Sequence, residues 1–355
     1  MSVRAAERAR GPETAPPPRD PARGSAAADG GFSRGQIVEV QRSRLLAAAV
    51  AAVDELGYGE VTVGEITTRA RVSRRTFYDL FAGREECLAA VLESVVALVA
   101  GELAAAGLGG LPWRERLRGG LCAILAFFDR EPALARVCVV GVLGGGPAVL
   151  RRREEILADL ARFVDEGRRE RGARGVDCSA LTAEGLVGAA FTILYARLLR
   201  REHEPLRGLA GELMGLLVLP YLGPAAARRE RARPAPGGAP VGTQVATPAA
   251  AGVAGDPLAG VSMRLTYRTA RVLGSVAELG EGGLEPSNRE VARHAGIADQ
   301  GQVSKLLARL ERVGLLANTG GGHAKGEPNA WRLTPTGERV AQSIRAHRGA
   351  GRRAA

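Results

Sequence analysis

The chain of 355 residues is long enough for two folded domains, or for one domain and a half-size module, and its hydrophobic content of 46% is sufficient for buried cores. Its 49 Lys+Arg against 38 Asp+Glu give a net charge of +11, a balance that attracts polyanions such as nucleic acids. Only Lys305 and Lys325 are lysines, and Ala and Gly are abundant, so a GC-rich genome also explains much of this composition. Charge alone therefore does not identify the partner.

The cysteines and the apolar runs exclude several classes of protein. The four cysteines are widely spaced, without a Cys-x-x-Cys pair, so we expect reduced, buried thiols and neither a metal nor a cofactor. Residues 1–33 are rich in Pro, Ala and Gly without the apolar core of a signal peptide, and we expect a disordered arm there. The best apolar runs, around residues 137–144 and 213–222, are too short to span a bilayer, so we expect no membrane partner.

The first folded segment, residues 34–98, holds the most informative motif of the chain at residues 62–81. Thr62 and Glu65 form a Thr-x-x-Glu capping box that begins one short helix. The chain then turns at Arg71, and Ser73 is the N-cap of a second helix. Two short helices with a tight joint predict a helix-turn-helix, in which the second helix enters the DNA major groove.

The second helix of this motif has two distinct faces. Phe77, Leu80 and Phe81 share the inward face, and the outward face carries Arg74, Arg75, Thr76 and Tyr78. Two arginines, a threonine and a tyrosine are suited to contacts with phosphates and base edges. The alternative is a surface helix hairpin with a solvated basic face.

This segment resembles the DNA-binding domain of the TetR/AcrR family of bacterial regulators. Residues 37–56 resemble the family's first helix and residues 84–98 the start of its fourth, where Arg84 occupies a position at which Lys or Arg is usual. Two positions depart from the pattern: Arg71 replaces the usual Gly at the turn, and Thr67 replaces a common Ala. The resemblance implies a homodimer of the bacterial cytoplasm, associated with the nucleoid, that binds a double-stranded DNA operator and an unknown small-molecule effector. The expected DNA-binding residues are Thr62, Ser73, Arg74, Arg75, Thr76, Tyr78 and Arg84.

Residues 99–223 have the pattern of a helical ligand-binding and dimerisation domain. From residue 84 to the end of this domain, helices are expected near 84–106, 113–130, 132–142, 147–171, 180–201 and 206–222, with breaks at glycine- and proline-rich points. The resemblance implies that the last two helices pair with their twins in a dimer, with Leu186 and Ile193 in the interface. It also implies a ligand cavity, for which the candidate lining is Trp113, Phe127, Phe128 and Tyr195, although aromatic residues at helical spacing usually just pack.

Residues 224–255 are Pro-, Ala- and Gly-rich, and we expect a flexible linker there. Beyond it, residues 256–346 repeat the helix-turn-helix pattern: Ser287 and Glu290 form a second capping box, and a helix follows at about 300–313. A hairpin then follows around a glycine-rich loop, and the whole resembles a MarR-type winged helix; residues 347–355 are a disordered tail. Its expected DNA-binding residues are Gln302, Ser304, Lys305, Arg309 and Lys325.

Enzyme motifs are absent from the sequence. The Gly-Gly-Gly runs lack the spacing of a phosphate-binding loop, and His203-Glu204 has no second histidine four residues later. The expected fold is therefore all-α, with a small β-wing, and the expected function is that of a sequence-specific, ligand-responsive dimeric repressor. Two alternatives stay open: a ligand-independent architectural DNA-binding protein, and a regulator whose winged helix binds a protein partner.

Overall fold

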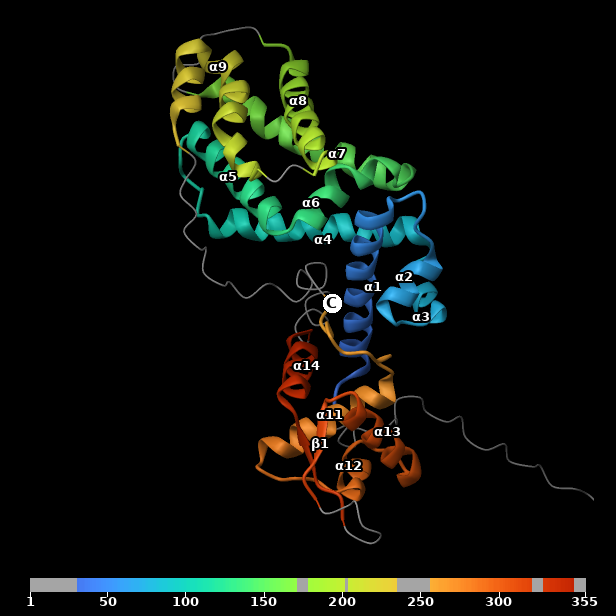
Figure 1. Ribbon diagram of the computed structural model, residues 1–355. Helices are drawn as coiled ribbons and strands as arrows, with labels where there is room; N and C mark the ends of the chain where they lie inside the picture. Colours follow the sequence, from blue (N-terminus) through green and yellow to red (C-terminus); the bar gives the residue numbers. More distant parts are fainter. Residues whose placement is uncertain (1–30, 171–177, 202–203, 235–255, 321–327, 348–355) are drawn as a thin grey trace, which may run out of the picture.

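The computed structural model describes residues 31–170, 178–201, 204–234, 256–320 and 328–347, and these residues are mostly helical (Figure 1). The predicted arm up to residue 30, most of the predicted linker and the last eight residues lie outside the described residues. The N-terminal domain consists of α1 (Arg34–Leu56), α2 (Val63–Ala70), α3 (Arg74–Leu80) and the first half of α4 (Arg84–Ala105).

The middle domain is a layered bundle that continues from α4. Its elements are α5 (Trp113–Arg130), α6 (Pro132–Val139), α7 (Pro147–Asp165), α8 (Ala180–Leu199) and α9 (Ala210–Ala232), with short 3-10 turns η1 (Gly141–Gly144), η2 (Glu166–Arg169) and η3 (Leu206–Leu209). These helices occur close to the expected ranges, because proline and glycine mark most of their ends.

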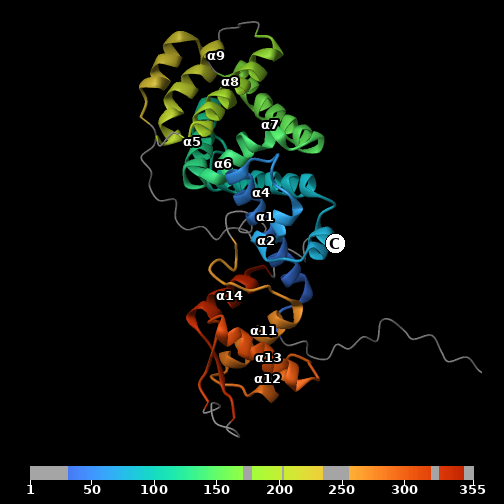
Figure 2. The same ribbon diagram turned by 45° about the vertical axis from the view of Figure 1, so that its right-hand side comes forward.

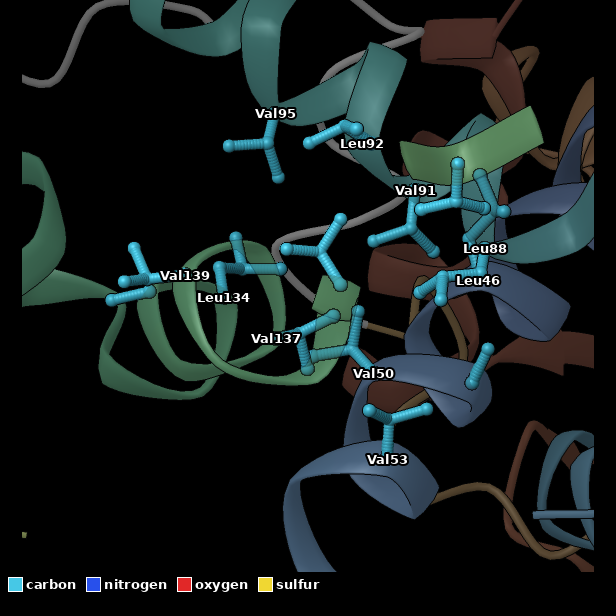
Figure 3. Packing of buried hydrophobic residues seen from close by; sticks show 14 of the residues in the cluster. Leu46, Val50, Val53, Leu88, Val91, Leu92, Val95, Leu134, Val137 and Val139 are labelled. Carbon is cyan, nitrogen blue, oxygen red and sulfur yellow. The ribbon is translucent and has the colours of Figure 1, made fainter. Parts of the chain in front are cut away.

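One continuous core joins the N-terminal and middle domains. Figure 3 shows side chains of α1, α4 and α6 interdigitating, among them Leu46, Val91 and Val137, each at most 1% exposed. Leu125, Leu194 and Leu213 extend the same cluster into α5, α8 and α9. Helix α4 therefore belongs to both domains, and its side chains pack in the core that they share.

Helix α9 differs from the expectation that a flexible linker begins at residue 224. The backbone leaves helical geometry at Gly223, at φ 77°, and a helical segment then folds back along the first half of α9 up to Ala232. The two halves pack closely, since a Cβ on Gly211 would lie 2.9 Å from the carbonyl oxygen of Arg231. The abundance of alanine, proline and arginine suggested a linker, but Ala226, Ala227 and Glu230 are buried.

Three helical stretches are long and apolar enough to cross a membrane by length and composition, namely Arg84–Ala105, Leu181–Leu199 and Leu206–Ala232. The expectation that every apolar stretch is too short was wrong, because it counted uninterrupted apolar runs and not whole helices. All three helices pack against neighbouring helices of the bundle.

The C-terminal domain, residues 256–347, has its own core. Its elements are α11 (Tyr267–Glu281), α12 (Asn288–His294), α13 (Gln300–Arg312), β1 (Leu316–Asn318), β2 (Trp331–Leu333) and α14 (Pro335–Ala346). The two strands pair antiparallel, with Ala317 opposite Arg332. This order of a helix, a helix-turn-helix and a hairpin is the one expected, and the hairpin is limited to two three-residue strands.

Candidate nucleic-acid interface

The N-terminal helix-turn-helix is built by local capping. Thr62 Oγ1 accepts a hydrogen bond from the backbone N–H of Glu65 at 3.1 Å, and Ser73 Oγ accepts one from Thr76 at 3.0 Å. The predicted capping box at Thr62 is only half formed, because the Glu65 carboxylate accepts a hydrogen bond from Arg69 at 2.6 Å instead of turning back. Thr62 and Ser73 therefore hold helix ends in place, and their hydroxyls are engaged.

The turn between α2 and α3 requires a left-handed residue. Arg71 adopts φ 52° and ψ 38°, the conformation for which glycine is usual and for which a side chain carries a steric cost. Arg71 N–H nevertheless bonds the carbonyl of Thr68, and its side chain is exposed. The exposed guanidinium is thus available next to α3.

Helix α3 is seated by its inward side chains and presents its outward ones to solvent. Phe77 is fully buried and Phe81 is 3% exposed, and their rings lie 5.6 Å apart. On the opposite side Arg74 and Arg75 are exposed and Tyr78 is 58% exposed. These three side chains form the outward face of α3, whereas the Thr76 hydroxyl lies 2.7 Å from Ser73 Oγ.

The side chain of Arg84 makes contacts within the domain that the sequence did not reveal. Its Nη1 donates to the carbonyl oxygen of Val61 at 2.7 Å and lies 3.3–3.4 Å from those of Gly59 and Tyr58, and its guanidinium covers the Tyr58 ring at 4.7 Å. Arg84 therefore clamps the loop between α1 and α2. The expected phosphate contact would have to compete with these bonds.

The second helix-turn-helix, α12 and α13, is also capped at both helix starts. Ser287 and Glu290 form the predicted reciprocal capping box, and Asp299 caps α13 by accepting from Gln302 N–H at 3.0 Å. Lys305 and Arg309 are exposed on the outer side of α13, and Gln302 is half-buried. Lys325 lies outside the described residues.

Ser304 belongs to a polar network that positions the hairpin. Its Oγ accepts from Asn288 Nδ2 at 2.9 Å, and Asn288 Oδ1 accepts from the indole N–H of Trp331 at 2.6 Å. Asn318 Nδ2 donates to Asn329 Oδ1 at 2.8 Å across the hairpin. The asparagines were not identified from the sequence. Their signal, polar residues flanking a buried tryptophan, becomes visible only when the three segments are placed together.

An apolar cavity of about 530 Å³ lies within the middle domain between α4, α5, α7, α8 and α9. None of the four aromatic residues expected to line a ligand cavity lines this one. Trp113 instead packs edge-to-face on Tyr221, and Phe127 and Phe128 lie in the core shared with the N-terminal domain, against which Tyr195 also packs. Leu103, Leu117, Leu121, Ile124, Phe163 and Phe191 contribute to the actual lining.

The two residues expected in a dimer interface lie two helical turns apart on one side of α8 and differ in exposure. Leu186 is 9% exposed and belongs to the core beneath the helix, whereas Ile193 is 36% exposed. Leu181, at 70% exposure, lies on the outer side with Ile193, as do the exposed small residues Gly185, Gly188 and Ala189. Leu219 of α9 is 39% exposed.

Two of the four thiols lie in surroundings that suppress their ionisation. All four cysteines are free, and Cys87 is buried completely. Burial raises the pKa of Cys87 and that of Cys138 to about 12, which leaves both protonated at neutral pH. Within the described parts of the chain, no group of three or more His, Cys, Asp or Glu side chains is placed to hold a metal ion.

Comparisons with known proteins bear on the N-terminal half of the chain. Residues 45–91 match the sequence model of the family described as bacterial regulatory proteins, tetR family. An uncharacterized HTH-type transcriptional regulator of Mycobacterium bovis and two of Mycobacterium tuberculosis are 28% identical over 134 residues, which is 37% of this chain and 61% of each relative. The chain therefore matches less than two thirds of the length of these relatives.

Solved structures with similar folds cover about half of the chain. The fatty acid degradation regulator FadR from Bacillus halodurans is 18% identical, with a TM-score of 0.43 over 49% of this chain and 96% of that one. A TetR-like transcriptional regulator from Rhodococcus sp. RHA1 is 24% identical, with a TM-score of 0.40 over 50% of this chain and 94% of that one. These likenesses are too distant to transfer a ligand to this chain.

Proposed function

Since residues 45–91 form a helix-turn-helix domain of the tetR type, we propose that this protein is a sequence-specific transcriptional regulator that binds double-stranded DNA through α3. The single observation that carries the proposal is the outward face of α3, where Arg74, Arg75 and Tyr78 are exposed on a helix fixed by the buried Phe77. A rigidly seated helix can hold such side chains against base edges without ordering them anew at each encounter.

Each outward side chain has a role that its chemistry supports. The guanidinium of Arg75 can donate two hydrogen bonds to the O6 and N7 atoms of a guanine, and Tyr78 offers a hydroxyl and an apolar ring for base edges. In this proposal Arg74, at the start of α3, and Arg71, at the turn, contact the flanking phosphates. In this proposal Thr62, Ser73 and Thr76 support the helix, and Arg84 orients the loop before α2.

A homodimer follows from the reach of one recognition helix. One α3 reads only a few base pairs, and two-fold pairing places two such helices in successive major grooves about 34–36 Å apart. The outer side of α8, with Leu181, Ile193 and small residues between them, supports a close helix–helix contact between protomers. Leu186 contributes to the core of its own protomer and is not part of this proposed contact.

We propose that the apolar cavity is the effector site and that the protein is a ligand-responsive repressor. We further propose that it acts in the bacterial cytoplasm, at the nucleoid. Its lining is almost wholly apolar, with Arg116 and Asp159 as the charged members, so it suits a mainly hydrocarbon ligand. Arg116 already forms an ion pair with Glu166 at 2.5 Å, which leaves little unpaired charge for an ionic head group. The cavity touches the last turn of α4 at Leu103 and Ala104. Helix α4 packs on α1 and α1 packs on α3, so a ligand can act on α3 through these two helices.

For the C-terminal domain we propose a winged helix that adds DNA contacts. Residues 256–355 hold 15 Lys+Arg against 9 Asp+Glu, and Lys305 and Arg309 are exposed on α13. Arg289 on α12 and Arg332 on the hairpin are exposed as well, so cationic side chains occur on all three elements that a winged helix presents to DNA. The second candidate role, binding of a protein partner, is a separate outcome of the experiments below.

Selection of binding sites from random-sequence DNA with the full chain tests the proposal. The expected result is enrichment of a short, two-fold-related sequence whose half-sites are spaced by about one helical turn. An architectural DNA-binding protein would recover DNA without an enriched motif, and that result would contradict the proposed function.

A further inference from the structure

Helix α1 contributes to two hydrophobic cores. Its second half, including Leu46 and Val53, packs with α4 and α6, as described above. Its first half packs on the C-terminal domain instead: Ile37 is 3% exposed and Val40 fully buried, in one cluster with Leu273 of α11 and Ile344 of α14. One uninterrupted helix of 23 residues therefore crosses from the N-terminal domain to the C-terminal domain (Figures 1 and 2).

Buried polar contacts fix the position of α1 on the C-terminal domain. Arg44 is 2% exposed, and its Nε lies 3.1 Å from a carboxylate oxygen of Asp256 while its Nη1 donates to the carbonyl of Met263 at 3.2 Å. Gln41 Nε2 donates to the carbonyl of Leu265 at 3.0 Å. These directional contacts oppose rotation and sliding of the helix, because the buried Arg44 guanidinium would be left without a partner.

The backbones themselves meet just before α1 begins. Gly31 N–H donates to a carboxylate oxygen of Glu278 at 2.9 Å, and Phe32 is 3% exposed in the core of the C-terminal domain. A Cβ added to Gly274 of α11 would lie 2.8 Å from Gly31 Cα and 2.8 Å from the backbone nitrogen of Phe32. Only glycine at position 274 permits this approach. We call the contacts of residues 31–44 with the C-terminal domain the α1 joint.

Because α1 packs on α3 and also on α11 and α14, and the α1 joint fixes the C-terminal domain on α1, we propose that the two helix-turn-helix motifs form one rigid composite DNA reader with a fixed spacing. The inference rests on the proposed function, since it takes DNA as the partner of both motifs. It goes beyond that function because the sequence predicted two DNA-binding domains joined by a flexible linker, whereas a composite reader is a single rigid unit.

A rigid reader has a consequence that a tethered pair lacks. A tether of some twenty residues lets the second module find its subsite at many separations, with affinity changing only slowly with distance. A rigid unit accepts one separation and one rotational phase, and five inserted base pairs turn the second subsite by about half a helical turn. Both five and ten inserted base pairs then move that subsite out of reach.

The joint can be opened without removing any core side chain. Gly274→Gln places a side chain where the Gly31–Phe32 backbone lies, and the new side chain is solvated once the joint opens. Gly280→Gln is the matched control, because it makes the same change in the same helix at a position where a Cβ meets nothing within 4 Å. Glutamine has a higher helix propensity than glycine, so both changes favour α11, and neither alters the net charge.

Hydrogen exchange of the full chain tests the joint without DNA. In the wild type and in Gly280→Gln, backbone amides of residues 37–44 should exchange as slowly as those of residues 45–53. In Gly274→Gln, residues 37–44 should exchange at least about tenfold faster, because a two- to three-turn helix without packing is marginal in water. The backbone amides of α13 and α14 should stay equally protected from exchange in all three proteins, which would show that the C-terminal domain remains folded. Fast exchange of residues 37–44 in the wild type would overturn the inference.

Spacing variants of the selected DNA site test the composite reading. With the wild type, insertion of five or of ten base pairs between the segments protected by α3 and by the C-terminal domain should lower the affinity at least about tenfold. In Gly274→Gln the affinities for the three spacings should differ by less than about threefold.

Two results would overturn the composite reader and differ from a failure of the proposed function. In both, residues 37–44 are protected from exchange, but the wild type either binds all three spacings with equal affinity or protects no second segment of DNA. Either result would assign the C-terminal domain to a protein partner while α3 still reads DNA. Failure to select any DNA sequence would instead overturn the proposed function, and this inference with it.

Discussion

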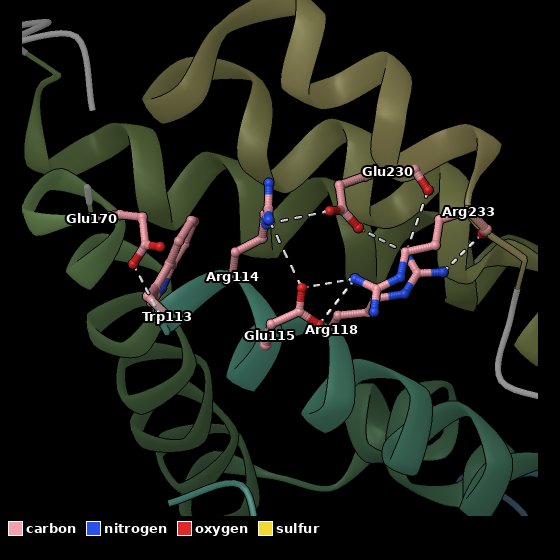
Figure 4. A network of polar contacts seen from close by, with 7 residues as sticks. All are labelled: Trp113, Arg114, Glu115, Arg118, Glu170, Glu230 and Arg233. Carbon is pink, nitrogen blue, oxygen red and sulfur yellow. Dashed lines mark hydrogen bonds and ion pairs between the residues drawn. The ribbon is translucent and has the colours of Figure 1, made fainter. Parts of the chain in front are cut away.

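Replacing Glu230 by leucine should strongly destabilise the middle domain, because it strands a buried arginine. Glu230 is 3% exposed and lies in the part of α9 that folds back after Gly223, and Arg118 of α5 is buried to the same degree. Arg118 Nη1 lies 2.8 Å from the Glu230 carboxylate, and its Nη2 donates to the carbonyl of Arg233 (Figure 4). The same Nη2 also donates to the carbonyl of Pro234. In Glu230→Leu the guanidinium keeps the carbonyls but loses its buried counter-charge.

The magnitude follows from the burial of both partners. Removal of one member of a buried ion pair costs about 3–5 kcal/mol of unfolding free energy, because the remaining charge stays desolvated. At a denaturant dependence of about 2 kcal/mol per M of urea, this loss lowers the unfolding midpoint by about 1.5–2.5 M. Replacing both members, as Arg118→Met with Glu230→Leu, should cost clearly less than the single change, even though the bonds to the Arg233 and Pro234 carbonyls are lost too.

Tryptophan fluorescence during urea unfolding measures the effect locally. The chain has two tryptophans, and Trp331→Phe leaves Trp113, which packs on Tyr221 within the same domain. Glu212→Leu is the control, since Glu212 lies in the same helix and forms an exposed pair with Arg231. It should change stability by less than about 1 kcal/mol. A single Glu230→Leu change that costs no more than the control would refute this account of the ion pair.

Two further predictions concern the cavity and the dimer. Leu121→Trp should fill part of the cavity and weaken binding of the uncharged dye N-phenyl-1-naphthylamine at least about tenfold, whereas Leu111→Trp, at a residue 44% exposed and outside the lining, should not. Equal dye binding by both variants would remove this cavity as the ligand site. Ile193→Arg should yield monomers in sedimentation experiments, because it buries a charge in the proposed interface, whereas Leu143→Arg, on the exposed η1 turn, should not. Intact Ile193→Arg dimers would place the interface elsewhere.

Local signals in the sequence were sufficient to locate both helix-turn-helix motifs and the N-caps of three of their helices. Ser73 and Ser287 cap the helices that they were expected to cap, and the turn at Arg71 has the positive φ that its place in the motif requires. These features depend on residues three to four positions apart, which the linear sequence displays directly. The inward face of α3 was visible for the same reason.

Features that depend on distant segments were missed or misassigned. Arg84 was expected at a phosphate, because nothing in its neighbourhood in the sequence reveals the carbonyls of the preceding loop that it binds. Residues from 224 were expected to form a linker, because composition does not reveal that Glu230 meets Arg118 across 112 positions. The α1 joint escaped detection for the same reason, since Arg44 and Asp256 are 212 positions apart.

The cavity shows a different limit of sequence-based inference. Aromatic residues at helical spacing were expected to line it, yet Trp113 and Phe127 are 4% exposed and fill cores. Large aromatic side chains gain most from complete burial, and a cavity is lined by whatever the surrounding helices leave uncovered. Here that is leucine together with alanine, glycine, valine and two phenylalanines, whose pattern in the sequence does not differ from that of any other core.

The affinity of α3 variants for the selected DNA site tests the central claim most directly. Arg75→Ala and Tyr78→Ala should each weaken binding to that site by about 1–3 kcal/mol, a factor of about 5–150, and weaken binding to unrelated DNA far less. Arg151→Ala, which removes the same charge from an exposed position on α7, should leave the preference for the site intact. Unchanged affinity of a folded Arg75→Ala/Tyr78→Ala double variant for the selected site would contradict the assignment of α3 as the DNA reader.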